Sequence, residues 1–428
     1  MTAPIVIVGA GPAGLAAAIA LRRRRAGPVL VLEREAEPGG IPRHADHQGF
    51  GARDLRRVMR GPAYARRYAA AAEAAGAEIR TGTMATGWTA DGALEVTSAA
   101  GRERIEAAAV LLATGCRERP RAARLVPGTR PAGVMTTGTL QQLVHLHGRR
   151  VGTSAVVVGA EHVSFSAVAT LAEGGARTVA IVTEAPRHQS FAAFRAGAAA
   201  RYRAPLHART AITAIHGRDR VEAVSLRSFD DGATRRVACD TVVFTADWIP
   251  EHELAVLAGI ELDPGTRGPV VDAALRTARP GVFAAGNVNH GAEAADVAAL
   301  AGRHAAAAVS AYLRDAAPWP ARSVPLRCAA PLHWVAPNAV AANAGPPPRD
   351  RFAVRAHAFL ERPEIEVVQD GRRLWHGRLR RVQPGRSAAL PAGWTGAVDP
   401  AGGTVDIRVL RARPASGAVA RLAGGARE

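Results

Sequence analysis

The sequence predicts an α/β protein with two Rossmann-like dinucleotide-binding domains and a small C-terminal β-rich domain. Two strand–turn–helix units, starting at Ile5 and at Ala155, indicate the two Rossmann-like domains. An Asp370-Gly371 turn between two strand-like segments indicates the β-rich domain. We expect the first dinucleotide-binding domain over 1–120 and 275–318, an inserted second one over 121–274, a linker over 319–348 and the β-rich domain over 349–428.

The composition fits a globular chain of two to three domains. Its 428 residues are 48% hydrophobic, and no stretch of about 18 uncharged apolar residues predicts a membrane span. The formal charge of +18 comes from arginine alone, because the sequence contains no lysine. The arginines are scattered and accompany no nucleic-acid motif, so a compositional bias explains the charge better than RNA or DNA binding does.

Three cysteines limit the redox chemistry that side chains can carry. Cys116, Cys239 and Cys328 are far apart and form no CxxC pair. This spacing predicts neither a disulfide framework nor a zinc or iron–sulfur site, and we expect no metal. A reducing, cytoplasmic setting fits free thiols.

Hydrophobic runs predict the elements of the first unit. Ile5–Val8 and Val29–Leu32 are apolar runs of strand length, and the alanine-rich segment between them predicts a helix to about Arg25. Alternating segments such as Ala93–Thr97 predict a small antiparallel layer. They lead into a further apolar strand at Ala109–Leu112.

The second unit repeats this pattern. Ala155–Val158 is its strand, a helix follows to about Glu173, and Thr178–Thr183 is the next strand. The chain then returns to the first domain, with an apolar strand at Val282–Ala285 and a long alanine-rich helix to about Leu313.

The C-terminal region has a different pattern. Trp319–Pro348 is rich in proline and alanine and is interpreted as a linker. Glu364–Val368 and Arg373–Leu379 flank Asp370-Gly371, a pair that favours the positive φ angles of a type I′ hairpin turn. The pattern predicts a small β domain and does not indicate its function.

The turn after the first strand carries the clearest functional signal. Gly9, Gly11 and Gly14 form a GxGxxG motif between a strand and a helix, and Glu33 ends the following strand. The first glycine permits the tight turn, the second lets the backbone approach a pyrophosphate, and the third lets helix and strand pack closely. The pyrophosphate then lies at the helix N-terminus, and Glu33 can accept hydrogen bonds from ribose hydroxyls. The motif therefore predicts dinucleotide binding.

Two later segments resemble motifs of the FAD-dependent pyridine nucleotide-disulfide oxidoreductase superfamily. Val110–Gly115 is similar to the ATG segment that crosses between the domains, and Gly281–Asn287 is similar to the late GD motif. In the resemblance, the acid of the GD motif contacts the ribityl chain of FAD. Asn287 stands in its place and can still donate and accept hydrogen bonds. The resemblance implies that the dinucleotide is FAD and that the inserted domain is of the NAD type.

Longer segments resemble the flavin subunits of heteromeric amino-acid and opine dehydrogenases or oxidases, including hydrogen cyanide synthase. They are Pro38–His44, Gly61–Ala65, Asp247–Leu254 and Gly286–His290. The resemblance implies that Gly40 and Ile41 wrap the flavin side of FAD, and that Arg43 and His44 lie nearby, suited to a hydrogen bond to the ring or to a substrate anion. His44 is the catalytic candidate, and a loop histidine that pairs with local backbone is the alternative.

These motifs define the predicted FAD contacts. The set combines the first turn, the acid after the second strand with its neighbour, the loop around residue 40 and two later turns. Its members are Gly9, Ala10, Gly11, Pro12, Ala13, Gly14, Glu33, Arg34, Gly40, Ile41, Arg43, Ala113, Thr114, Gly115, Gly286 and Asn287.

The sequence departs from disulfide-reducing relatives where their redox cysteines stand. Thioredoxin-reductase-like proteins carry a CxxC after a Gly-Val pair, whereas here Gly133-Val134 is followed by Met135-Thr136-Thr137-Gly138. Without the cysteine pair no disulfide can relay electrons from the flavin, so we expect no disulfide reductase activity.

The second turn departs from GxGxxG. It reads Gly159-Ala160-Glu161-His162-Val163-Ser164, and only the first glycine remains. Glu161 places a carboxylate where a pyrophosphate would approach the helix, and a helix N-terminus stabilises such an anion by about 0.3 to 1 kcal/mol. We therefore expect NAD(P)H binding to be lost. Glu184 still stands where a ribose-binding acid belongs, and a variant site that binds NADH is the alternative.

Together the motifs predict an FAD-dependent oxidoreductase. It oxidises an amine or amino-acid-type small molecule, or transfers electrons for a second, oxidase-like subunit that does, and the flavin carries the electrons. The alternatives are an NAD(P)H-dependent flavin reductase and a non-catalytic FAD-binding scaffold subunit. Neither nucleic acid nor a membrane is an expected partner, and the sequence is compatible with an oligomer.

Overall fold

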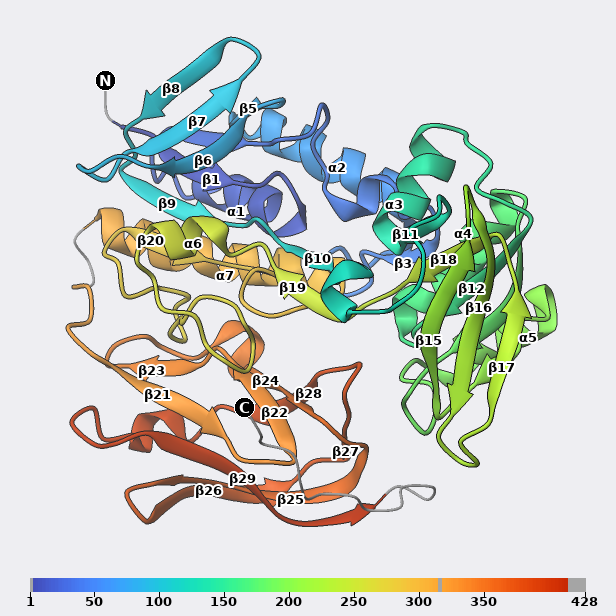
Figure 1. Ribbon diagram of the computed structural model, residues 1–428. Coiled ribbons are helices and arrows are strands. Elements are labelled where there is room, and N and C mark those ends of the chain that lie inside the picture. The colour runs from blue at the N-terminus through green and yellow to red at the C-terminus, as the bar shows by residue number, and fades with distance from the viewer. Residues whose placement is uncertain (1–2, 315–317, 415–428) are drawn as a thin grey trace.

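Three sheet-based domains make up the structure (Figure 1). The computed structural model describes residues 3–314 and 318–414. The first domain carries the N-terminus, the inserted domain lies to its side, and the C-terminal domain, orange to red, lies below both. The predicted fold class is confirmed.

The first domain is built on a five-stranded parallel sheet with the order β20-β9-β1-β2-β5. Val8 pairs with both Leu32 and Leu112, and Leu112 pairs with Ala284, so four strands end level at one edge. The apolar runs are buried, as expected for a parallel sheet. The strands are β1 (Ile5–Val8), β2 (Val29–Leu32), β5 (Glu78–Arg80), β9 (Ala109–Leu112) and β20 (Val282–Ala284).

Two helices, α1 (Pro12–Arg23) and α7 (Ala295–Leu313), pack against each other beside this sheet. Gly302 on α7 permits the close approach, because a Cβ there would overlap the carbonyl oxygen of Ala13. The other elements of the domain are η1 (Ile41–Arg43), β3 (Gln48–Phe50), β4 (Met59–Arg60), α2 (Gly61–Ala74), α6 (Glu253–Leu257) and an antiparallel layer of β6 (Met84–Trp88), β7 (Leu94–Ser98) and β8 (Gly101–Ile105).

The inserted domain repeats the parallel pattern with the order β11-β18-β12-β13-β14. A ribbon of β10 (Cys116–Glu118) and β19 (Trp248–Pro250) carries the chain into and out of it. Its elements are η2 (Ala122–Arg124), β11 (Val134–Thr136), α3 (Thr137–Gln141), the π-helical η3 (Gln142–Leu146), β12 (Ser154–Val158), α4 (His162–Glu173), β13 (Arg177–Val182), α5 (Ala192–Tyr202), β14 (Leu206–His207), β15 (Thr210–Gly217), β16 (Val221–Ser228), β17 (Thr234–Ala238) and β18 (Thr241–Phe244).

The C-terminal domain consists of two sheets that share one apolar core. The predicted hairpin is present: Asp370 and Gly371 have φ angles of 48° and 78° and join β25 to β26. The elements are β21 (Ser323–Cys328), β22 (Leu332–Ala336), β23 (Ala339–Ala341), η4 (Pro348–Asp350), β24 (Arg351–Ala356), β25 (Leu360–Gln369), β26 (Arg372–Arg378), β27 (Arg381–Val382), β28 (Ala388–Pro391), η5 (Thr395–Ala397) and β29 (Val405–Pro414).

The prediction of a linker over 319–348 is wrong, because β21, β22 and β23 lie within this interval. Val324 and Leu326 of β21 are buried while the residues between and after them are exposed, which is the alternation of a half-buried strand. β21 pairs with β29, where Leu326 lies opposite Val405. This pairing is distant in sequence, so local composition does not reveal it. Residues 415–428 of the predicted β domain lie outside the described residues.

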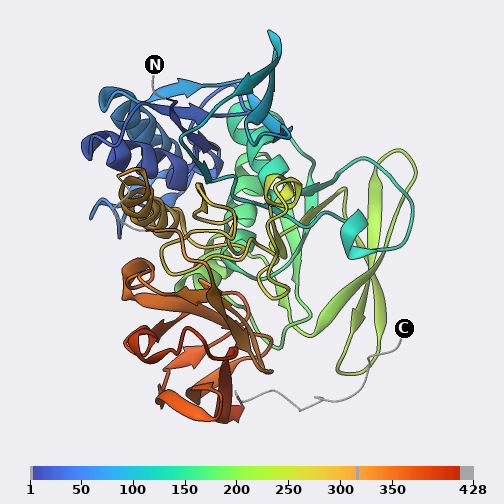
Figure 2. The same cartoon turned by 90° about the vertical axis from the view of Figure 1, so that its left-hand side faces the viewer.

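The C-terminal domain is fixed to the first domain (Figure 2). The side chain of Asn338 accepts a hydrogen bond from the N–H of Val271 at 2.8 Å. Arg355 donates to the carbonyl oxygens of Gly291 and Ala292 at 2.8 and 2.6 Å, just before α7 begins. Among the described residues, no helix has the length and apolar character needed to cross a membrane.

Candidate FAD site and adjoining cavity

The turn after β1 forms a cradle for a phosphate. Gly9 has a φ of 110°, which favours glycine, and a Cβ there would lie 2.5 Å from the carbonyl oxygen of Ala113. A Cβ on Gly14 would overlap the carbonyl oxygen of Gly9. Gly11 is different: it is the N-cap of α1, and no described atom lies within 4 Å of a Cβ placed on it. The structure thus leaves open space at a helix N-terminus, where N–H groups favour an anion.

Glu33 lies beside this turn at the end of β2. Its Oε2 accepts a hydrogen bond from the N–H of Ala10 at 3.0 Å, and its Oε1 accepts one from the N–H of Glu35 at 2.9 Å. Burial raises the pKa of Glu33, and these two backbone groups act in the opposite direction. Each carboxylate oxygen keeps acceptor capacity, so Glu33 can also receive a hydroxyl hydrogen bond.

The loop around residue 40 packs directly on the turn. The N–H of Gly39 donates to the carbonyl oxygen of Ala10 at 2.8 Å. Gly40 has a φ of 62°, and a Cβ on it would lie 2.9 Å from the Cα of Gly11. Ile41 follows with 53% of its surface exposed.

Two predicted contacts, Arg34 and Arg43, are held by carboxylates. Arg34 pairs with Glu251 at 3.6 Å, and Arg43 pairs with Glu35 at 3.5 Å and Glu37 at 3.8 Å. These partners engage the guanidinium groups in this structure. The sequence reasoning placed Arg43 near the flavin ring and did not foresee either acid.

The two later motifs lie at the same sheet edge, because β1, β9 and β20 end level. The hydroxyl of Thr114 donates to the carbonyl oxygen of Glu251 at 2.7 Å. Gly286 has a φ of 83°, and a Cβ on it would lie 2.7 Å from the Cβ of Ala13. The Asn287 side chain bonds to the backbone N–H and carbonyl oxygen of Glu293 at 2.9 and 3.2 Å. Asn287 therefore closes the loop that precedes α7.

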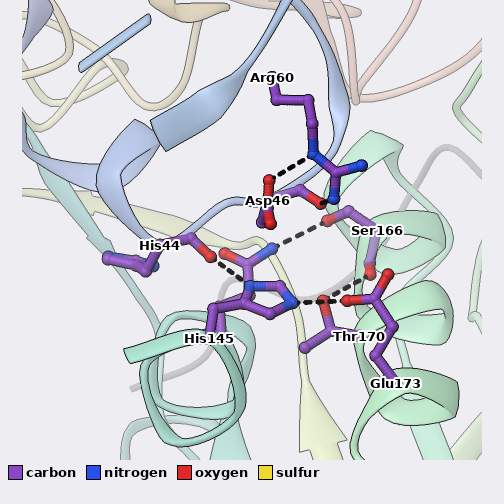
Figure 3. A network of polar contacts seen from close by, with 8 residues as sticks. His44, Asp46, Arg60, His145, Ser166, Thr170 and Glu173 are labelled. Carbon is purple, nitrogen blue, oxygen red and sulfur yellow. Dashed lines mark hydrogen bonds and ion pairs between the residues drawn. The ribbon is translucent and has the colours of Figure 1, made fainter. Parts of the chain in front are cut away.

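His44 lies where the first domain meets the inserted domain (Figure 3). Its side chain is buried, and its Nδ1 has no hydrogen-bond partner among the described residues. Burial, followed by the charge of Arg43, lowers the pKa of His44 to about 4, while a hydrogen bond with Gln141 acts in the opposite direction. The carbonyl oxygen of His44 lies 2.5 Å from His145 Nδ1, and His145 Nε2 lies 2.8 Å from Glu173 on α4. His44 is thus neutral near pH 7 and part of a domain contact.

The turn after β12 is filled by its own side chain. The N–H of Glu161 donates to the Oγ of Ser164 at 3.1 Å, and that hydroxyl lies 3.0 Å from Glu161 Oε2. The same Oγ lies 2.6 Å from the Oγ1 of Thr245. Burial raises the pKa of the Glu161 carboxyl. A protein carboxylate therefore stands at the N-terminus of α4.

The cysteines are free thiols in separate places. Burial raises the pKa of Cys116 to about 12 and that of Cys239 to about 11. At the start of α3, where disulfide-reducing relatives carry CxxC, the N–H of Gly138 donates to Glu118 at 2.8 Å. In residues 3–314 and 318–414, no cluster of His, Cys, Asp and Glu side chains could hold a metal.

A cavity of about 330 Å³ adjoins the predicted flavin end of the site, and sequence reasoning missed it. Gly286 and Asn287 form part of its wall, together with Glu293 and one face of α7. The C-terminal domain provides the opposite wall, and Phe191 of the inserted domain reaches in. Four arginines line it: Arg53, Arg349, Arg351 and Arg386. Arg349 and Arg351 follow the proline run at 346–348, at the start of the interval predicted as the β-rich domain, and their spacing is the one local signal in the sequence.

The similarity to a known protein family covers the first and inserted domains. The family described as pyridine nucleotide-disulphide oxidoreductase matches residues 3–302. An opine oxidase subunit of Agrobacterium tumefaciens (strain Ach5) is 28% identical over 341 residues, which are 72% of this chain and 66% of the relative. The alpha subunit of sarcosine oxidase from Corynebacterium sp. (strain P-1) is 34% identical over 215 residues, 46% of this chain and 21% of the relative. The chain thus spans less than two thirds of the length of these curated relatives.

The solved structure of Lactococcus lactis thioredoxin reductase shares the fold. Its TM-score is 0.60 at 19% identity, and the match covers 73% of this chain and all of the reductase. At this identity the likeness concerns the fold alone.

Proposed function

The chain belongs to the pyridine nucleotide-disulphide oxidoreductase family, and on that premise we propose an FAD-dependent oxidoreductase that oxidises an amine or amino-acid-type substrate. In the other form of the proposal, the chain transfers electrons for a second, oxidase-like subunit that oxidises the amine. The names of two relatives, subunits of an opine oxidase and of a sarcosine oxidase, support both the amine class and the partner subunit.

The open helix N-terminus at Gly11 carries the FAD assignment. An FAD pyrophosphate would lie there on the backbone N–H groups of α1, and Glu33 would accept a ribose hydroxyl. Ile41 would lose its exposure against the flavin, and Gly286 with Asn287 would lie on the ribityl side. When bound, FAD supplies acceptance of a hydride equivalent from the substrate. The residues that are present fit this group.

His44 remains a proposed proton acceptor. Its imidazole is neutral near pH 7, and Nδ1, which has no hydrogen-bond partner among the described residues, is the atom that would accept the proton. The pKa of about 4 makes this imidazole a weak base at that pH, which counts against the role. In the alternative, His44 is a loop histidine that pairs with local backbone. Its contact with His145 is made by the main-chain carbonyl oxygen and assigns no role to the imidazole.

A disulfide reductase activity is not part of the proposal. The three cysteines are free thiols, and Met135-Thr136-Thr137-Gly138 stands after the Gly-Val pair where disulfide-reducing relatives carry CxxC. The Glu161 carboxylate at α4 argues in the same way against the rival NAD(P)H-dependent flavin reductase, because it would repel a cofactor phosphate. The formal charge of +18 makes RNA-linked chemistry a weaker alternative. Failure of the protein to retain RNA at moderate salt would exclude this alternative.

The test is an anaerobic titration of the FAD-loaded protein with NADH, then NADPH, then sarcosine and opines, followed by flavin absorbance. We expect no bleaching by either nucleotide and bleaching by a member of the amine series. Rapid bleaching by NADH would overturn the proposal in favour of the flavin reductase.

The scaffold alternative has its own test. A scaffold would copurify with an oxidase-like chain and show no turnover alone on any amine. Turnover by the lone chain would exclude it.

A further inference from the structure

We propose that the cavity between α7 and the C-terminal domain is the substrate site, and that it binds an amine carrying a carboxylate: Arg386, with Arg349 and Arg351, holds the carboxylate, and Glu293 receives the amine. The inference rests on the proposed function in taking the ligand as the substrate, and it gives the C-terminal β domain a role. The cavity of about 330 Å³ is large enough for a small metabolite.

The arginines that the C-terminal domain contributes to the cavity wall lack acidic partners among the described residues. Arg53 pairs with Asp296 at 3.1 Å. In contrast, Arg349, Arg351 and Arg386 have no carboxylate within 4.0 Å among the described side chains. Burial, followed by the neighbouring charge of Arg351, lowers the pKa of Arg349, and an anion beside these two side chains would relieve the charge repulsion. Guanidinium groups also match the geometry of a carboxylate.

Arg386 is the best placed of the three. It is half-buried, and its guanidinium carbon lies 4.2 Å from the centre of the exposed Phe191 ring, a cation–π arrangement. Burial, followed by the charges of Arg381 and Arg380, lowers the pKa of Arg386 from its ordinary value. The side chain is thus held beside the cavity at an electrostatic cost that a bound carboxylate offsets.

Acceptors lie on the opposite wall. Glu293 Oε1 and His290 Nδ1 are buried and have no hydrogen-bond partner among the described residues. Arg355 forms an ion pair with Glu293 at 3.8 Å, a distance too long for a hydrogen bond to Oε1, and its guanidinium donates hydrogen bonds to Gly291, Ala292 and Ser387. A buried acceptor without a donor is costly, and an ammonium or amine N–H would satisfy Glu293.

The location connects the cavity to the chemistry. Gly286 and Asn287, which line it, are also the predicted contacts on the ribityl side of FAD. A substrate held with its carboxylate on the C-terminal domain and its amine on Glu293 would present the C–N bond near the flavin end of the cofactor.

Calorimetry on the oxidised, FAD-loaded, full-length protein tests the site with three probes. L-Glutamate carries both groups, glutarate lacks the amine, and pentylamine lacks the carboxylates. We expect glutamate to bind most tightly. Arg386→Gln should weaken glutamate and glutarate by roughly tenfold and leave pentylamine unchanged, while Glu293→Gln should weaken glutamate and pentylamine.

Two further variants keep the test decisive. Arg386→Lys should recover part of the glutarate affinity, since it keeps the charge, and Arg66→Gln on the exposed face of α2 should change none of the three affinities. Failure of all three probes to show saturable binding would overturn the inference, and so would glutarate binding that is the same in wild type and Arg386→Gln. Probe binding that follows the expected pattern in a protein whose flavin no amine reduces would instead keep the site and overturn the proposed function.

Discussion

The turn after β1 and the turn after β12 follow nearly the same backbone path. The helix N-cap residues Gly11 and Glu161 have φ, ψ angles of −80°, −175° and −88°, −174°. The preceding glycines, Gly9 and Gly159, both have positive φ and both donate 2.8 Å hydrogen bonds to the neighbouring strand. The two turns are therefore alike in the backbone angles of the helix N-cap and in the hydrogen bond that the first glycine makes to the neighbouring strand.

They differ in what stands at the helix N-terminus. The first turn offers open space at Gly11, and the second holds the Glu161 carboxylate, which Ser164 and Thr245 keep in place. The comparison teaches that a Rossmann-like backbone can persist after its phosphate position is taken by a side chain. Fold likeness alone therefore says little about which cofactor binds.

Transferring the acid from one turn to the other should have the largest effect. Gly11→Glu places a carboxylate at the proposed pyrophosphate position, and we expect FAD affinity to fall by at least roughly a hundredfold. The fold should persist, because the position is open and its backbone angles suit any residue. Flavin content after purification measures the loss. Gly197→Glu, at an equally open glycine on α5, is the control; full FAD retention by Gly11→Glu would contradict the site.

A substitution at Gly14, the third glycine of the motif, should have the next largest effect. Gly14→Ser gives the first turn the residue of the second, and its Cβ would overlap the carbonyl oxygen of Gly9. We expect a loss of about 2 kcal/mol of stability from overpacking, together with weaker FAD binding. The reciprocal Ser164→Gly introduces no steric clash, so it should cost less stability than Gly14→Ser. Urea unfolding of both variants ranks them, and an equal loss would refute the difference between the turns.

Acid should weaken the contact between the two domains at His44. The folded-state pKa of about 4 lies below the ordinary 6.5, so the unfolded chain takes up the proton first as the pH falls. The contribution of His44 to the free energy of unfolding is therefore complete above pH 6.5. It declines between pH 6.5 and 4 by about 1.4 kcal/mol per pH unit. His44→Gln should flatten the slope in urea unfolding at several pH values. The exposed His147→Gln should leave it unchanged.

The smallest expected effect concerns Glu161 itself. Burial raises its pKa, so the folded chain holds the proton more tightly, and stability from this group is present at low pH and lost as the pH rises through the folded pKa. Glu161→Gln keeps the capping geometry without the titration. The variant should gain stability relative to wild type as the pH rises, measured by thermal unfolding. If the difference in stability between wild type and Glu161→Gln stays constant with pH, ionisation of the Glu161 carboxyl does not destabilise the folded chain.

The sequence by itself determined the two Rossmann-like folds and the glycine turn after β1. β1, β2 and β9 begin and end where the apolar runs predicted, since short strands and glycine turns are specified by neighbouring residues. The role of Glu161 at a helix N-terminus was likewise predictable, because it depends on a turn of six residues.

Only the tertiary structure decided the rest. β21 was hidden in a proline- and alanine-rich stretch because its partner β29 lies far along the chain. The pairing of Arg34 with Glu251 and the burial that lowers the pKa of His44 depend on segments far apart in the sequence. Glu35 and Glu37, which pair with Arg43, lie in the same loop as that arginine. The arginine-lined cavity combines residues of all three domains. Packing creates such a site, and no local pattern of residues encodes which distant segments meet.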